Sequence, residues 1–149
     1  MRDSYNSAIV AHLLDPAAAI TADTKSNYVD VSGYESAEFM VVMGASANLD
    51  SGDYFTPVLQ HSDLTTDVSF AAVDSADILD AFSAVNSGSL DSTTQRVGYI
   101  GDKRYVRVLL DETADTDNGT LIVGVIARLE KGRHNDPTSS DTPTVATAT

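Results

Sequence analysis

The 149-residue sequence contains no cysteine and no tryptophan, and only 7% of its residues are aromatic. Without cysteine the chain cannot form disulfides, thiolate zinc sites or a cysteine nucleophile. The hydrophobic fraction is nevertheless 42%, which separates the chain from intrinsically disordered sequences. A chain of this length and composition can bury the core of one domain.

Basic residues are also scarce, because nine Lys and Arg stand against 22 Asp and Glu and give a net charge of −13. The imbalance lies in residues 1–95, which hold 14 acidic and two basic residues. Binding to nucleic acid requires Lys and Arg to neutralise phosphates, so no nucleic-acid partner is expected. Such an acidic half is typical of a surface kept soluble by charge repulsion, or of a negative face matched to a basic partner.

Long hydrophobic runs and targeting signals are missing as well. The apolar stretch at residues 8–14 is too short to cross a bilayer, and Arg2 beside Asp3 does not make a secretory signal. We therefore expect a soluble protein that is synthesised in the cytoplasm and has no membrane partner.

Short apolar runs between turn signals are typical of strands. They predict strands near residues 28–31, 37–43, 54–62, 68–73, 95–100, 104–110 and 121–129, while residues 77–82 fit a strand or one helical turn. The continuous run 37–43 indicates a strand covered on both faces, and Pro57 indicates a sheet edge or a bulge. Asn118-Gly119 between two apolar runs predicts a β-hairpin. Seven or eight strands without a convincing helix predict an all-β fold, an antiparallel β-sandwich.

The composition divides the chain into an N-terminal arm at 1–26, a β-sandwich domain at 27–132 and a polar C-terminal tail at 133–149. The arm has room for one short helix, at about residues 5–14, before Pro16 interrupts the run. The tail is rich in Ser, Thr, Pro and Asp. Both ends are poor in large apolar side chains, so we expect them to gain order only by packing on neighbouring molecules.

The sequence contains no recognisable catalytic or cofactor motif. It has three histidines, His12, His61 and His134, but no Gly-x-Ser-x-Gly elbow and no glycine-rich phosphate loop. Residues 115–119 resemble a calcium loop superficially, but aligning Gly119 puts Ala114 and Val125 at the first and last ligand positions. An incidental cation site would use carboxylates among Asp111, Glu112, Asp115 and Asp117. We therefore predict a protein that is not an enzyme and has no cofactor, catalytic residue or dedicated metal ligand.

Residues 97–108 combine features of a contact surface. Gly98 and Gly101 allow a tight strand–turn–strand corner, and tyrosine and arginine are the side chains that dominate protein interfaces. The candidate contact residues in this segment are Tyr99, Lys103, Arg104, Tyr105 and Arg107. The alternative is a hairpin with a solvated basic edge.

Three segments resemble small structural proteins encoded among the head genes of tailed bacteriophages and gene transfer agents. They are residues 31–37 (VSGYESA), 55–63 (FTPVLQHSD) and 98–108 (GYIGDKRYVRV), followed after the last strand by Arg133 and His134. The last of the three is the most specific, and the resemblance covers about residues 27–137.

The resemblance implies a virion structural protein, and foremost a decoration or cement protein on the outside of an assembled capsid. It implies the major capsid protein and further copies of this chain as partners, in a homo-oligomer such as a trimer. It adds Arg133 and His134 to the candidate contact residues and brings no catalytic residue. Two other functions stay open: a head–tail connector or tail component, and a carbohydrate- or receptor-binding β-sandwich module.

Overall fold

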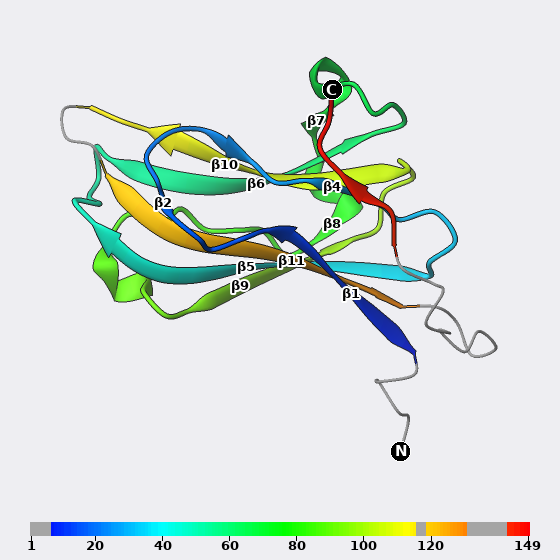
Figure 1. Cartoon of the computed structure of the whole chain (residues 1–149), viewed down its shortest axis with the longest axis horizontal. Coiled ribbons are helices and arrows are strands. Elements are labelled where there is room, and N and C mark those ends of the chain that lie inside the picture. Colours follow the sequence, from blue (N-terminus) through cyan, green and yellow to red (C-terminus); the bar gives the residue numbers. More distant parts are fainter. Residues whose placement is uncertain (1–6, 116–118, 131–142) are drawn as a thin grey trace.

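The computed structural model describes residues 7–115, 119–130 and 143–149. The chain is all-β: 53% of the described residues lie in strands and 7% in helical turns, and two antiparallel sheets pack face to face (Figure 1). The predicted antiparallel β-sandwich is therefore confirmed. No helix in the described part is long and apolar enough to cross a membrane.

The two sheets contain strands from distant parts of the sequence. Sheet A has the order β1 (Ala8–Leu14), β11 (Thr120–Glu130), β5 (Ser36–Ala47), β9 (Thr94–Tyr99), β8 (Ile78–Leu79), and β2 (Ala19–Ile20) also pairs with β11. Sheet B has the order β12 (Val145–Ala146), β4 (Tyr28–Asp30), β10 (Tyr105–Thr113), β6 (Tyr54–Ser62), β7 (Ala71–Ala72), and β3 (Thr24–Lys25) also pairs with β10. Three 3-10 turns lie in the connections: η1 (Asp67–Ser69), η2 (Ser75–Asp77) and η3 (Gly88–Leu90).

The core lies between the sheets and is built from alternate residues of each long strand. In β5 the buried side chains are Ala37, Phe39, Val41 and Met43. Successive side chains of a strand point to opposite faces, so this alternation turns one face of the strand into the core. Of the outward residues of β5, Met40 is half-buried and Val42 is exposed. The expectation of a strand covered on both faces is therefore not met within the described residues.

The short helix expected near residues 5–14 is wrong, because residues 8–14 form β1. This strand pairs antiparallel with β11, from Ala8 opposite Glu130 to Leu14 opposite Val125. Ala11 and Leu13 are buried in the core, at 4% and 1% exposure. Their period of two is a strand pattern, and pairing with β11 outweighs the weak local preference for a helix.

Residues 143–149 also pack on the sandwich that they belong to. In β12, Val145 pairs with Val29 and Ala146 pairs with Tyr28. The backbone N–H of Thr149 donates to the carbonyl of Thr65 at 3.2 Å. For the described residues at both ends of the chain, the expectation that order comes only from neighbouring molecules is therefore wrong, since backbone pairing compensates for the small side chains.

The hairpin predicted at Asn118-Gly119 is wrong. The strands before and after it, β10 and β11, belong to different sheets, so the chain crosses from sheet B to sheet A here. Asn118 lies outside the described residues. A Cβ at Gly119 would lie 2.7 Å from Cδ2 of Leu49, so a larger residue there would displace the end of that leucine side chain. The corner between β9 and β10 likewise joins the two sheets.

Pro57 lies where β6 has a strand on one side only, as predicted. On that side it is opposite Leu110 of β10. On the other side, Phe55 exchanges backbone hydrogen bonds with Val85, and the carbonyl of Leu59 accepts from Val73. Proline has no N–H to donate, so it is tolerated between these two contacts. The strand predicted at 68–73 is reduced to β7 after the turn η1, and residues 77–82 contribute only β8.

Candidate functional site

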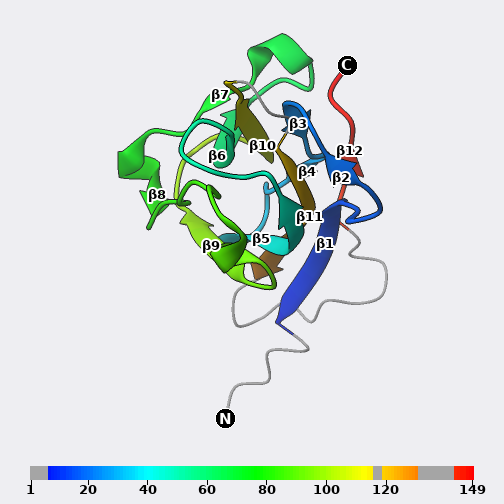
Figure 2. The same ribbon diagram turned by 90° about the vertical axis from the view of Figure 1, so that its left-hand side faces the viewer.

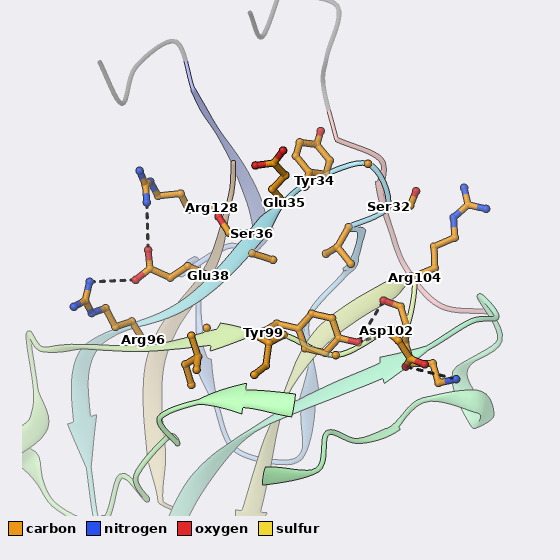
Figure 3. A pocket seen from close by; sticks show the side chains of 18 of the residues that line it. Ser32, Tyr34, Glu35, Ser36, Glu38, Arg96, Tyr99, Asp102, Arg104 and Arg128 are labelled. Atoms are coloured by element: carbon orange, nitrogen blue, oxygen red, sulfur yellow. Dashed lines mark hydrogen bonds and ion pairs between the residues drawn. The ribbon is translucent and has the colours of Figure 1, made fainter. Parts of the chain in front are cut away.

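A groove of about 890 Å³ opens where β5 begins and β9 ends (Figure 3). One wall is formed by residues 31–38, which connect β4 to β5 and begin β5. The other wall is formed by residues 98–104, which end β9 and turn toward β10. Leu79 and Ile100 add exposed apolar surface, with exposures of 59% and 55%.

The groove brings together two segments, 31–38 and 98–104, that are at least 60 positions apart in the sequence. Residues 31–37 and 98–104, which line it, belong to two of the three sequence segments on which the expected likeness to phage head proteins is based. The third, 55–63, contacts the groove wall through His61 and Asp63. All three segments therefore converge on one structural feature.

Tyr99 is the residue on which they converge. Its ring is buried, with 6% exposure, and its hydroxyl accepts the backbone N–H of Lys103 at 2.9 Å. Nδ1 of His61 lies 3.0 Å from the same hydroxyl. Burial, followed by the nearby carboxylates Asp102, Asp77 and Asp63, raises the pKa of Tyr99, so the hydroxyl stays protonated at neutral pH. A neutral, fully engaged phenol fits a structural role at the corner.

Gly101 allows the turn to pass close to this ring. A Cβ at Gly101 would lie 2.6 Å from the hydroxyl oxygen and 2.7 Å from the ring carbons of Tyr99. Only glycine permits so close an approach of the backbone to a buried ring. The tight corner predicted from Gly98 and Gly101 thus has a physical cause in the packing of Tyr99.

Four of the nine Lys and Arg residues of the chain line the groove: Arg96, Lys103, Arg104 and Arg128. Each of them is paired with a carboxylate. Arg104 holds Asp30 through Nε at 3.0 Å and Nη2 at 2.7 Å. Lys103 holds Asp63 at 2.9 Å, and this hydrogen bond lowers the pKa of Asp63 and raises that of Lys103. The groove is therefore electrically balanced on a strongly acidic protein.

At this end of the groove, burial and hydrogen bonding act in opposite directions on the pKa of Asp30. Burial opposes ionisation of its carboxyl, but hydrogen bonds from Arg104 and Ser32 outweigh burial, and the pKa of Asp30 is lowered. The backbone N–H of Ser32 donates to Asp30 at 2.9 Å, which fixes the start of the 31–38 wall.

The opposite end of the groove carries a row of charged side chains on sheet A (Figure 3). Glu38 of β5 lies between Arg96 of β9 at 3.2 Å and Arg128 of β11 at 3.7 Å. Arg128 also pairs with Glu130. Every guanidinium in this row has a carboxylate partner. A binding partner would therefore meet paired side chains that can share hydrogen bonds, and not a free positive charge.

The structure separates the predicted contact residues. Tyr99, Lys103 and Arg104 line the groove, and Tyr105 beside them packs its ring 5.1 Å from that of Tyr28. Arg107 does not contribute exposed surface, since it is 2% exposed. Arg133 and His134 lie outside the described residues.

Arg107 is buried under the segment that follows β6. Its guanidinium donates to Asp67 at 2.5 Å and to Gln60 at 2.8 Å, and it stacks 4.2 Å from the ring centre of Phe70. Arginine buried in this way is fully paired and holds a loop in place. Its assignment as an interface residue is therefore corrected to a structural role.

Sequence patterns did not identify Glu38, Arg96 or Arg128 as part of a site. The period-two alternation of β5 indicates that Glu38 points outward, but not which neighbouring strands supply its partners. Those partners follow from the strand order β11-β5-β9. This order places Arg96 and Arg128, which are 58 and 90 positions from Glu38 in the sequence, on either side of it.

The remaining titratable clusters are small. His12 pairs with Asp15 at 2.8 Å on the surface next to β1. No group of three or more His, Asp or Glu side chains suited to a metal ion occurs among residues 7–115, 119–130 and 143–149. Asp117, one of the four carboxylates considered for an incidental cation site, lies outside these ranges.

Comparison with known proteins gives no match: no protein-family model, no curated protein and no solved structure is significantly similar to the chain. The likeness to phage head proteins therefore stays a prediction from the sequence segments quoted above.

Proposed function

We propose that this chain is a structural protein of a virus particle, a decoration or cement protein that binds the outside of an assembled capsid and strengthens contacts between capsid subunits. The observation that carries the proposal is the convergence of residues 31–37, 55–63 and 98–104 at one groove. Segments that resemble one class of protein meet at one place, as expected for a shared binding surface.

The chemistry of the groove supports a protein partner. It combines exposed aliphatic side chains at Leu79 and Ile100 with arginine and tyrosine, a combination typical of interface centres. Since its cations are already paired, a free anion gains little there. The buried ring of Tyr99 does not form the exposed aromatic platform that a sugar would stack on.

Binding to an assembled shell tests the proposal. Purified protein is mixed with assembled phage capsids that lack it, and co-sedimentation is measured. We expect saturable binding to shells and little binding to isolated capsid subunits. No binding of the wild-type chain to shells would refute the function.

A matched pair of variants locates the contact. Ile100→Glu introduces a charge in the groove, whereas Val68→Glu makes the same kind of change at a residue that is 95% exposed outside it. We expect Ile100→Glu to weaken shell binding at least about tenfold, equivalent to roughly 1.4 kcal/mol, and Val68→Glu to bind like the wild type. Equal binding by both variants would rule out the groove as the contact.

Copy number distinguishes this role from a neck or tail position. Quantitative mass spectrometry of purified particles is expected to find the chain in numbers comparable to the major capsid protein. A handful of copies per particle would instead identify a connector or tail component.

A further inference from the structure

The outer face of sheet A carries apolar side chains that are open to solvent in the described structure. Residues directly opposite on neighbouring strands share a face of the sheet. Met40 of β5 is opposite Ile126 of β11 and Arg96 of β9, and Val42 of β5 is opposite Thr94. Met40 and Ile126 are partly buried, and Val42 is 38% exposed.

The same surface continues to both sides of this centre. Val10 of β1, opposite Arg128, is 63% exposed. Ile122 of β11 lies over Gly44 of β5, whose added Cβ would be 3.1 Å from the isoleucine side chain. The surface therefore extends across β1, β11, β5 and β9, which form one layer in Figures 1 and 2. We call these four strands' outward side the outer face of sheet A.

An apolar outer face is unusual for an antiparallel sandwich, in which the solvent side of each sheet is normally polar. On sheet B the outward residue Arg107 is covered by Asp67 and Phe70 from the segment after β6. Leu109 and its cross-strand partner Val58 on sheet B are partly buried, as Met40 and Ile126 are on sheet A. The continuous apolar run at residues 37–43 indicates a strand that is covered on both faces. Within the described residues only its inward face is covered, so the apolar residues on its outward face have no partner there.

The charge of this face is compatible with a second copy as its cover. Two chains of net charge −13 repel each other, so they can associate only where the local charge is small. On the outer face of sheet A, Glu38 and Glu130 are balanced by Arg96 and Arg128. These polar side chains lie among the apolar ones: Arg96 is opposite Met40, and Arg128 lies between Val10 and Glu38. The exposed His12 is opposite Ile126 on the same face.

The size of the face is also adequate. Four strands spaced about 4.8 Å apart and rising about 3.3 Å per residue give a surface roughly 20 Å by 30 Å, on the order of 600 Å². Stable protein interfaces bury roughly 600–1,000 Å² on each partner. Two such flat faces can pack about 10 Å apart, as sheets do within a sandwich.

We propose that the outer face of sheet A binds the same face of a second copy of this chain, forming a two-fold symmetric dimer. In such an isologous contact each face supplies the apolar surface that covers the other. The dimer does not depend on the proposed shell binding and is measured on the purified chain alone.

The test is the mass of the full chain in solution, by sedimentation equilibrium or light scattering. The wild type is expected at twice the monomer mass of 15.7 kDa. The double variant Val42→Asp/Ile126→Asp places carboxylates in the apolar centre and is expected to weaken dimerisation at least about 100-fold. The control Leu64→Asp/Val68→Asp adds the same charge at two exposed apolar residues in another region and is expected to remain dimeric.

Three results would overturn this assignment: a monomeric wild type up to about 1 mM, a Val42→Asp/Ile126→Asp variant that is still dimeric, or equal loss of the dimer in both double variants. A monomeric wild type whose outer face is protected only on shells would assign the face to a capsid partner instead.

A cross-linking experiment avoids dependence on the folding of the double variant. The chain has no cysteine, so Val42→Cys carries a single thiol. With a short bismaleimide linker, this variant is expected to give a covalent dimer, whereas Val68→Cys is not. Absence of a cross-link at Val42, or equal cross-linking at Val68, would contradict the proposed face.

Discussion

Nδ1 of His61 lies 3.0 Å from the hydroxyl of Tyr99, and this contact joins the two sheets of the sandwich. His61 belongs to β6 in sheet B, and Tyr99 ends β9 in sheet A. The same hydroxyl accepts the backbone N–H of Lys103, in the turn that carries the chain from one sheet to the other. One phenol therefore organises the wall of the groove.

Removing this hydroxyl is expected to destabilise the protein. Tyr99→Phe leaves the Lys103 N–H and His61 without their partner, and we expect a loss of roughly 1–2 kcal/mol in the free energy of unfolding. Tyr105→Phe, at a half-buried tyrosine six residues later, is the control and is expected to cost less than about 0.5 kcal/mol. Urea unfolding followed by circular dichroism measures both. A Tyr99→Phe variant as stable as the wild type would show that the hydroxyl contributes nothing.

The approach of Gly101 to Tyr99 gives a second prediction. Gly101→Ala places a Cβ 2.6 Å from the Tyr99 hydroxyl, and displacing the ring or the turn is expected to cost roughly 1–3 kcal/mol. Gly88→Ala is the control, because a Cβ there meets its nearest neighbour at an ordinary 3.7 Å. Thermal unfolding of the two variants gives the comparison, and equal midpoints would mean that the corner adjusts freely.

Much of the fold could be predicted from local patterns. The alternation of buried and exposed residues in β5 identifies its inward side chains. Pro57 has no N–H to donate to a neighbouring strand, so it indicates a place where β6 lacks a strand on one side. Both signals concern a single strand and its own backbone. The glycines of the 98–101 segment likewise indicate a tight corner without knowledge of the rest of the chain.

Other features depend on contacts between distant residues and could not be predicted. Asn118-Gly119 indicates a turn, but the choice between a hairpin and a crossing to the other sheet is made by the packing of β10 and β11. The ion pair of Arg104 with Asp30 spans 74 residues, so no local pattern contains it. For the same reason no local pattern distinguishes β1 from an unpaired arm, since β1 is held by its pairing with β11.

The low pKa of Asp30 predicts how stability depends on pH. The pKa of the Asp30 carboxyl is lower in the folded chain than its unfolded value of about 3.9. Such a carboxyl contributes its full stabilisation at pH values above the unfolded pKa, and this contribution is lost as the pH falls through the folded pKa. We therefore expect Asp30→Asn to be less stable than the wild type at pH 7, with the difference shrinking below about pH 4.

Comparing variants is necessary because acid also relieves the repulsion of a chain with charge −13, which acts in the opposite direction. That relief is nearly the same in the wild type and in Asp30→Asn, so it cancels in their difference. Asp111→Asn, at an exposed aspartate of β10, is the control for loss of one charge. Urea unfolding at pH 7, 5, 4 and 3 is the measurement. A stability difference between the wild type and Asp30→Asn that stays constant down to pH 3 would contradict the lowered pKa of Asp30.

Arg107 and Arg104, three residues apart, are expected to differ sharply when each is replaced by alanine. Arg107 is 2% exposed and loses its pair with Asp67, its bond to Gln60 and its stacking on Phe70, so Arg107→Ala should cost roughly 3 kcal/mol. Arg104 is exposed, and solvent replaces much of its pair with Asp30, so Arg104→Ala should cost far less. Chemical denaturation of both variants distinguishes these roles. Similar losses would mean that burial does not set the strength of these ion pairs.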